Sequence, residues 1–362
     1  MKSDSPFSKL PSISDLLGHP AVTQVVKRVN QTTIAQRATG FLEELQATLR
    51  HKLEQGQVPS LGQLAERFAR RLLGPAQTTL PAVNATGTIL GDRWPALPLA
   101  EPAVDEIVRL ASDYHADRQP LIERVLHGLR ELNSAEAALV VQSYPIALEI
   151  AKATQSPYQA ARYAGILDPA SYGLTPYATI TERLQGGAEL LVVDGAGLVG
   201  GPPCGILIGR RDRVDALSGH PHANIATPDA LSLAALAATL AIYQTDDRVI
   251  HQIPIWQLLA TPLENLEQRC QRLAMLIADN EKIASAVPTR GDGTWCDSQD
   301  VKLSAPSWAI VVKPHAESFA PVVDSLQYAM PQVLARVQHE EIWLDLRGVF
   351  PRWDQHLVAA IG

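Results

Sequence analysis

The stretch over residues 188–209 constrains the fold of this chain most, because two short apolar runs flank a loop rich in glycine and proline. Apolar runs such as 190–193 and 206–208, bounded by glycine and proline, are typical of buried strands. Five glycines stand between the two runs, and glycine reaches backbone angles that other residues adopt only at a cost. The pattern therefore predicts either a tight hairpin or a loop whose backbone approaches a ligand.

Composition indicates a soluble protein of about two or three domains. The chain has 362 residues, of which 46% are apolar and 19% charged, enough for a large core. It contains no apolar run long enough to span a membrane, and its first residues lack the apolar segment of a secretory signal. Its three cysteines, Cys204, Cys270 and Cys296, are isolated and show no zinc or disulfide pattern. We therefore expect a cytoplasmic protein.

Charge is distributed unevenly along the chain. Residues 1–75 carry a formal charge of +4 and the remainder −11, which gives the net charge of −7. A basic segment on an acidic body suits a polyanion such as RNA, and it equally suits a solvated helical face. Residues 11–73 also show helical spacing of apolar residues, for example Phe41, Leu45 and Leu49. An N-terminal helical domain over residues 1–75 is therefore expected.

Strand and helix patterns alternate through the rest of the chain, which predicts an α/β fold. Strands are expected at 135–141, 190–193, 206–208, 308–312, 333–337 and 342–346. Helices are expected at 103–114, 121–132, 143–152 and 230–243, and from 253 to about 278.

Several motifs resemble those of bacterial L-seryl-tRNA(Sec) selenium transferases, a family of aspartate-aminotransferase-like (fold type I) pyridoxal-phosphate enzymes. Gly200-Gly201-Pro202, followed by Cys204-Gly205-Ile-Leu-Ile-Gly209, looks like the segment just after that family's cofactor lysine. Asn84-Ala85-Thr86-Gly87 resembles the entry into its large domain, although the same residues also suit a plain turn. Residues 344–351 resemble its ending.

The chain departs from this family pattern where the chemistry lies. The family reads Ser-Gly-Asp-Lys before Gly-Gly-Pro, and here Gly197 takes the place of the lysine and Asp194 that of the serine. Pyridoxal-phosphate catalysis needs a lysine amine, a carboxylate at the pyridine nitrogen and a phosphate cup. Lys152, well into the helix that starts near Ser143, is about 13 Å from the end of that helix where a phosphate would sit. We therefore assign no catalytic residue.

The resemblance also implies that two or three strand–helix units of the family are missing after residue 155. The carboxylate for the pyridine nitrogen would lie in or beside that gap, and Asp168 stands too far along the chain for this role. Three residues remain as candidate remnants of cofactor binding. Gly200 and Gly201 belong to the glycine loop, and Ser143 lies at a strand-to-helix turn whose N–H groups suit an anion. Ser143 equally suits a helix cap.

Histidines supply the remaining candidates for a metal site. His220 and His222, with His251 elsewhere, are able to bind a metal in principle, but no third ligand with metal spacing stands nearby. We therefore expect no metal site.

The residues and the resemblance together imply a domain plan and a function. We expect a helical domain over 1–75 that resembles the family's tRNA-binding domain, a shortened pyridoxal-phosphate-transferase-like large domain over 76–250, and a C-terminal α+β domain over 251–362. The expected function is that of a degenerate selenium transferase-like protein that binds no cofactor but keeps tRNA-binding and homo-oligomer-forming surfaces, as a dimer or larger. The alternative is an active enzyme that converts seryl-tRNA(Sec) to selenocysteinyl-tRNA(Sec) and holds its cofactor in another way.

Overall fold

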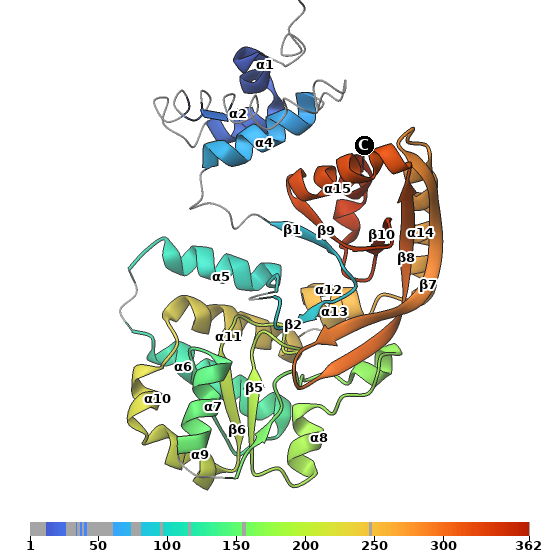
Figure 1. Cartoon of the computed structure of the whole chain (residues 1–362). Helices are drawn as coiled ribbons and strands as arrows, with labels where there is room; N and C mark the ends of the chain where they lie inside the picture. The colour runs from blue at the N-terminus through green and yellow to red at the C-terminus, as the bar shows by residue number, and fades with distance from the viewer. Residues whose placement is uncertain are drawn as a thin grey trace, which may run out of the picture. The chain divides into compact units, whose positions relative to one another are not determined.

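The chain divides into two compact units (Figure 1). Unit 1 comprises residues 1–86, 269–289 and 309–362, and unit 2 comprises residues 87–268 and 290–308. The computed structural model describes residues 12–26, 34, 37, 40–41, 61–73, 81–94, 97–114, 117–153, 157–245 and 248–361.

The division differs from the three consecutive domains expected from the sequence, 1–75, 76–250 and 251–362. Both units contain part of the long hairpin formed by β7 (Ile283–Asp297) and β8 (Lys302–Pro314). Because this hairpin carries the chain from one unit into the other and back, the units are discontinuous in sequence, and sequence alone gives no sign of such a crossing.

Unit 2 is built on a four-stranded sheet. Its strand order is β3 (Ala137–Val141), β6 (Gly205–Gly209), β5 (Leu190–Asp194) and β4 (Gln159–Ala160). Strand β6 is antiparallel to both of its neighbours, whereas β4 and β5 are parallel. Strands β3, β5 and β4 therefore end at the same edge of the sheet. The antiparallel pairing of β5 with β6 confirms that the glycine loop joins two neighbouring strands.

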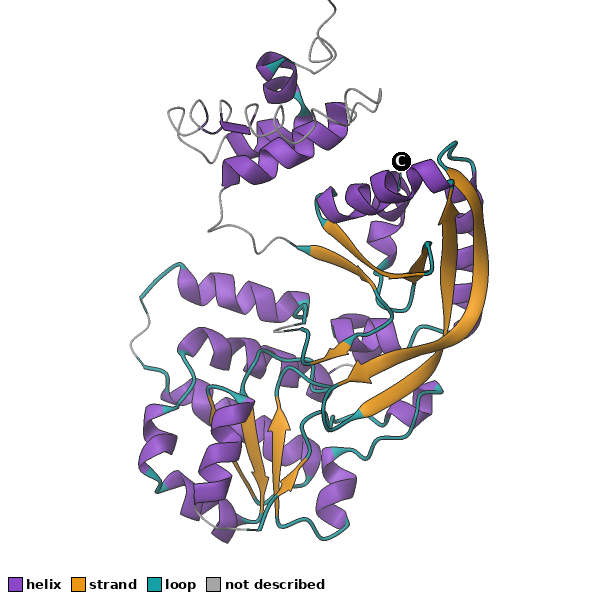
Figure 2. Cartoon of the chain, viewed as in Figure 1, coloured by secondary structure: helices purple, strands orange, loops and turns teal. Residues whose placement is uncertain are grey.

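Helices cover both faces of this sheet (Figures 1 and 2). One face packs against α7 (Tyr144–Ala153) and α9 (Arg211–Ser218), and the other against α6 (Gln119–Asn133), α8 (Ile180–Gln185) and α11 (Ala230–Thr245).

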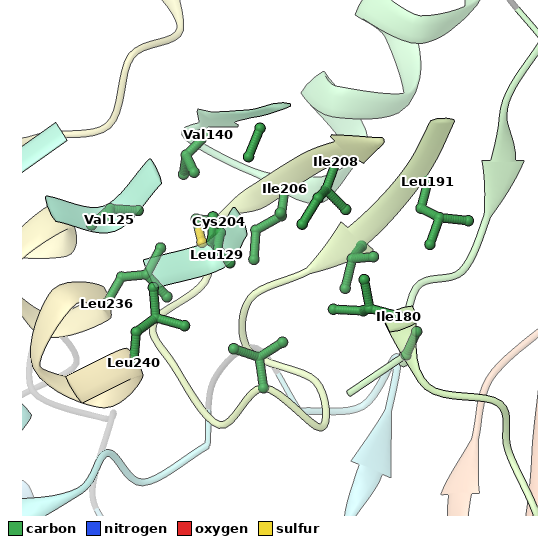
Figure 3. Packing of buried hydrophobic residues seen from close by; sticks show 14 of the residues in the cluster. Val125, Leu129, Val140, Ile180, Leu191, Cys204, Ile206, Ile208, Leu236 and Leu240 are labelled. Atoms are coloured by element: carbon green, nitrogen blue, oxygen red, sulfur yellow. The ribbon is translucent and has the colours of Figure 1, made fainter. Parts of the chain in front are cut away.

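Strand β5 shows why its sequence is apolar throughout. Leu190 and Val192 belong to the cluster on the α7 side, and Leu191 and Val193 to the cluster on the α11 side, part of which is drawn in Figure 3. Side chains alternate between the faces of a strand, so a strand covered on both faces needs a continuous apolar run. This is the run from which the strand was predicted.

The other elements of unit 2 lie around this core. Helix α5 (Glu101–Ala111) packs on α11 through Ala103, Ala235 and Ala238. The further elements are β2 (Leu90–Gly91), the 3-10 helix η3 (Pro169–Tyr172), α10 (Pro221–Ile225), α12 (Val249–Gln252) and α13 (Pro254–Leu259).

Unit 1 combines an N-terminal group of helices with an α+β part. The helices share a small core in which the rings of Phe41 and Phe68 lie 5.2 Å apart; residues 42–53 of the expected helix lie outside the described residues. The bounds are α1 (Ile13–Gly18), α2 (Pro20–Val26), α4 (Leu61–Leu73), β1 (Ala82–Ala85), α14 (Leu263–Ala278, which begins in unit 2), α15 (Phe319–Tyr328), β9 (Gln332–Gln338), β10 (Glu341–Asp345) and α16 (Asp354–Ala359).

Two C-terminal expectations need correction. The helix expected from 253 to about 278 is two helices, α13 and α14, separated by a short break that contains Pro262. Proline disfavours a helical conformation in the residue before it, so the chain turns there. The hairpin strands are also longer than the single strand expected at 308–312. Among the described residues, no helix has both the length and the apolar character to cross a membrane.

Candidate functional site

The edge where β3, β5 and β4 end is the place to look for a ligand, since open α/β sheets bind ligands outside the carboxyl ends of their strands. Ser143 lies there in the turn between β3 and α7, Asp194 ends β5, and Arg162 follows β4 by two residues. The glycine loop over residues 195–204 connects β5 to β6 at the same edge. All of these residues belong to unit 2.

Gly197, which the resemblance assigns to the family's lysine position, is packed against main chain. Its N–H donates to the carbonyl of Asp194 over 3.1 Å. A Cβ added at Gly197 would lie 3.2 Å from the Asp194 carbonyl oxygen, and 3.3 Å from both the Arg162 carbonyl oxygen and the Tyr163 Cα. These are tight contacts with backbone atoms at the end of β5 and in the turn after β4. The loop is therefore shaped around the absence of a side chain at 197.

Gly200 and Gly201 make close contacts and hydrogen bonds within the protein. Gly200 has a φ of +72°, and a Cβ there would lie 2.3 Å from Cγ2 of Ile253. The N–H groups of Gly200 and Gly201 donate to the carbonyls of Gly197 (3.0 Å) and Gly195 (2.9 Å). Gly200 thus has a conformational role, whereas Gly201 is closely packed, since a Cβ there would lie 3.0 Å from Cδ1 of Leu236. The binding of a cofactor by either glycine stays a prediction.

Two buried side chains hold the outer part of the loop. Trp256 donates through Nε1 to the carbonyl of Leu198 over 3.0 Å, and the Tyr243 hydroxyl donates to the carbonyl of Val199 over 3.1 Å. Burial raises the pKa of Tyr243, so this hydroxyl stays protonated and able to donate. The loop is therefore tied by hydrogen bonds to α11 and α13 as well as packed on them.

Ser143 is at the edge as the sequence predicts. It is half-buried, and its carbonyl accepts a hydrogen bond of 3.0 Å from the N–H of Ala147. Strand β6 passes close beneath it, since a Cβ added at Gly205 would lie 2.4 Å from the Ser143 carbonyl oxygen. The N–H of the preceding Gln142 donates to the carbonyl of Ala226. The role of Ser143 as a phosphate contact stays a prediction.

The most strongly connected side chain at this edge is Arg162, which the sequence analysis missed. Its Nη1 donates to Asp92, and its Nε lies 3.4 Å from Oδ2 of Asp194. The guanidinium also lies over the rings of Tyr144 and Tyr163, 5.4 and 5.1 Å from their centroids. We call Arg162, Asp92, Asp194, Tyr144 and Tyr163 the Arg162 cluster. Asp92 and Arg162 each follow the end of a strand, and this position was the local sign of their role. The sequence does not pair them, however, because they lie 70 positions apart.

The two carboxylates of the Arg162 cluster are also held by main chain. Oδ2 of Asp92 accepts from the N–H of Gln299 over 3.2 Å, and Oδ1 of Asp194 accepts from the N–H of Ala196 over 3.1 Å. The cluster therefore links the turn after β2, the ends of β4 and β5, and the turn between β7 and β8.

Burial and charge set the protonation of the Arg162 cluster. The hydrogen bond from Arg162 lowers the pKa of Asp92. Burial raises the pKa of Asp194, although Arg162 and the N–H of Ala196 counteract part of that rise. Burial also raises the pKa of both Tyr144 and Tyr163 to about 12. The tyrosines are therefore neutral at physiological pH, and the charges that meet there are one guanidinium and two carboxylates.

The other candidate residues of unit 2 lie outside this cluster. Lys152 is in the last turn of α7, where it forms an exposed 2.8 Å ion pair with Glu149. Lys302 is 76% exposed and lies 3.5 Å from Asp297. Asp168 caps η3 by accepting a 2.9 Å hydrogen bond from the N–H of Ala170. Both lysines are therefore paired with carboxylates at exposed positions.

His220 and His222 lie side by side at the start of α10. Nδ1 of His220 accepts from the N–H of His222 over 3.2 Å, and the two rings are 4.8 Å apart. The two histidines thus form the N-terminal cap of α10. A search of the described ranges finds no group of three or more His, Cys, Asp or Glu side chains that could hold a metal ion.

In unit 1, the Asn84–Thr86 motif forms a local turn. Oδ1 of Asn84 accepts hydrogen bonds from both the N–H (3.2 Å) and the hydroxyl (2.7 Å) of Thr86. This is the self-bonded turn that the sequence allowed for these residues.

The residues at this edge do not fit pyridoxal phosphate. The cofactor needs an amine and a carboxylate that faces its pyridine nitrogen. The resemblance assigns the amine position to Gly197, where even a Cβ would lie 3.2–3.3 Å from backbone atoms, and the nearby Arg162 guanidinium is already paired with Asp92 and Asp194. No catalytic step through this cofactor follows from these side chains.

Comparisons with known proteins place the chain among selenium transferases. The family model for L-seryl-tRNA selenium transferase matches residues 147–350. The L-seryl-tRNA(Sec) selenium transferase of Moorella thermoacetica is 33% identical over 199 residues, which is 54% of this chain and 42% of that protein. The Hyphomonas neptunium protein of the same name is 28% identical over 233 residues, 59% and 49% of the two chains. These matches span less than half the length of the relatives.

The fold comparison agrees with the expected class. The structure of D-glucosaminate-6-phosphate ammonia-lyase superposes with a TM-score of 0.51 at 13% sequence identity, over 80% of this chain and 96% of that one. The fold is that of the aspartate-aminotransferase-like, fold type I enzymes, as the sequence predicted. With more than half of its residues matched by the family model, this chain belongs to the L-seryl-tRNA selenium transferase family.

Proposed function

We propose that this chain is a degenerate member of its family that does not carry out pyridoxal-phosphate catalysis. The observation that carries the proposal is Gly197: the position has no amine, and a side chain there would press on the main chain of Asp194, Arg162 and Tyr163. Schiff-base chemistry needs a lysine amine within bonding reach of the cofactor. Lys152 and Lys302 are instead engaged with acidic partners at exposed positions.

We further propose that the chain keeps a tRNA-binding surface in residues 1–75. Support comes from the relatives, whose printed name specifies seryl-tRNA(Sec), and from the charge of +4 in this segment. The helices α1, α2 and α4 share an apolar core, so basic residues of α4 such as Arg67 and Arg71 have an ordered support. Basic side chains on such a support bind the phosphate backbone of RNA without needing a catalytic centre.

Self-association as a homo-dimer or higher oligomer is the third part of the proposal. Val104 and Val108 lie one turn apart on α5 and are 44% and 59% exposed. Neighbouring exposed apolar side chains suit contact with a second copy of the chain. Light scattering tests this directly: Val108→Glu should lower the measured mass, and an unchanged mass would remove α5 from the proposal.

The catalytic part is tested with purified full-length protein, pyridoxal phosphate, a selenium donor and seryl-tRNA(Sec). We expect the tRNA to bind and to be recovered with its seryl group unchanged. The alternative function, conversion to selenocysteinyl-tRNA(Sec), would be established by recovery of the selenium-containing product. An active relative serves as the positive control for the donor and the tRNA.

A further inference from the structure

We propose that Arg162 is a built-in cation that fills an aromatic and carboxylate site, and that this site binds free guanidinium-type cations once the arginine side chain is removed. The inference rests on the proposed function, because it concerns the edge of the sheet where a cofactor enzyme of this fold binds its ligand. It adds the chemical class of ligand that the edge would accept without the arginine side chain.

The geometry around Arg162 is that of a cation site. Two tyrosine ring centroids lie 5.1 and 5.4 Å from the guanidinium carbon, within the roughly 6 Å at which cation–π attraction acts. Asp92 and Asp194 approach two different nitrogens of the same guanidinium. The side chain of Arg162 is 29% exposed, that of Asp194 15% and that of Asp92 49%. Rings and carboxylates together surround one planar cation.

The four partners come from separate segments of unit 2. Tyr144 starts α7, Tyr163 follows β4 next to Arg162, Asp194 ends β5, and Asp92 follows β2. Their side chains meet around the guanidinium, so the site exists as a unit because these strand ends converge. A planar group with several N–H donors can satisfy both carboxylates at once, whereas an ammonium is a point charge with less directional reach.

The charges of the two carboxylates explain why the site without the arginine prefers cations. One guanidinium faces two carboxylates, so without the arginine charge the site would hold two negative charges beside two aromatic faces. A phosphate-bearing ligand is repelled by such a site, whereas a guanidinium regains the ion pairs and the ring contacts together. The ligand preference is therefore opposite to that of a phosphate seat.

The test is chemical rescue of Arg162→Ala. We expect a lower thermal unfolding midpoint for this variant, and a saturable recovery of the midpoint in millimolar ethylguanidinium, far below denaturing concentrations. The neutral, similarly shaped N-ethylurea should give no saturable recovery, because it lacks the charge. Wild type and Arg211→Ala, which removes an exposed guanidinium from α9, should show no saturable response to either compound.

If Arg162→Ala folds poorly, a refolding measurement and a second variant keep the test decisive. Soluble yield on refolding should then rise with ethylguanidinium and not with N-ethylurea. In Arg162→Ala/Asp92→Asn, the cation concentration for half-maximal recovery should increase several-fold, because one carboxylate is lost. Equal recovery with both compounds, or none with either, overturns the inference.

The outcome is separable from that of the proposed function. Failure of rescue, with no cofactor adduct on the wild-type protein, overturns only the cation site. A specific lysine adduct of pyridoxal phosphate on the wild-type protein overturns the proposed function, whatever the rescue shows.

Discussion

The absence of a side chain at position 197 has two consequences. In the place that the resemblance assigns to the lysine, glycine removes the amine that Schiff-base chemistry requires, and it lets the loop pack onto the main chain of Asp194 and of the turn after β4. The second consequence works against restoring the amine, because even a Cβ at 197 would lie 3.2–3.3 Å from backbone atoms.

Substitution at Gly197 should therefore destabilise the fold. We expect Gly197→Ala to lower the free energy of unfolding by about 1–3 kcal/mol, the usual range for overpacking a tight site. Gly291→Ala is the matched control, since a Cβ added at Gly291 meets nothing within 4 Å; it should change stability by about 0.5 kcal/mol or less. Urea denaturation measures both. Equal effects would show that the loop has room at 197.

The carboxylates of the Arg162 cluster should respond to pH with opposite signs. Burial raises the folded-state pKa of Asp194 above its ordinary 3.8, so its contribution to stability falls as pH rises from that value through the raised pKa. The pKa of Asp92 is lowered, so its contribution is present above 3.8 and is lost as pH falls through the lowered pKa.

Unfolding in urea between about pH 3 and pH 7 tests these signs. The stability of wild type relative to Asp194→Asn should decline with rising pH and then level off. Relative to Asp92→Asn it should increase with rising pH and then level off. Two differences of the same sign would contradict the assigned protonation states.

Some residues of the candidate site were predicted from the sequence, and others were not. Ser143 lies at the expected strand-to-helix turn, whereas the assignment of Gly197 to the family's lysine position rests on the contiguous motif around it and stays a prediction. Arg162 and Asp92 were not found, because their importance arises from a pairing across 70 positions that no local pattern encodes. Ion pairs between strand ends depend on strand order, and the order β3-β6-β5-β4 was not predicted.

At the scale of elements, the glycine loop is held by both conformation and contact. Gly200 and Gly173 share a φ of +72°, yet only Gly200 has a neighbour in the path of a Cβ, Cγ2 of Ile253 at 2.3 Å. Alanine substitutions at these two glycines therefore separate the cost of backbone strain from the cost of steric overlap.

We expect Gly173→Ala to cost about 1–2 kcal/mol from the left-handed backbone alone. Gly200→Ala should cost more, by about a further 1–3 kcal/mol, because the overlap with Ile253 adds to the same strain. Thermal or urea unfolding measures the difference. If the two variants lose the same stability, packing against α13 does not shape the loop.

Elements were easier to predict than their connections. Strands β5 and β6 were found because each is buried on both faces and thus apolar throughout. Helix α11 was found from a long alanine- and leucine-rich run. Strand β7 was missed because its sequence contains glycine, proline and charged residues and half of it is exposed. Its pairing with β8 overrides that weak local preference.

At the scale of the whole molecule, tRNA binding should depend on the basic helices of unit 1. Arg71→Glu, on an exposed position of α4, should weaken tRNA affinity and reduce the dependence of log affinity on log salt by about one unit. Arg211→Glu makes the same change of charge on α9 in unit 2 and should have a smaller effect. Equal losses from both variants would point to non-specific attraction.

The central claim is that this chain has the scaffold of a cofactor enzyme without the group that tethers the cofactor. It is tested most directly by incubating the purified protein with pyridoxal phosphate, reducing with borohydride, and mapping the modified lysines by mass spectrometry, with Lys152→Arg as the matched variant. We predict no single lysine modified in proportion to protein, only scattered surface labelling that falls with reagent concentration. One reduced pyridoxyl group per chain at a single lysine would contradict the claim.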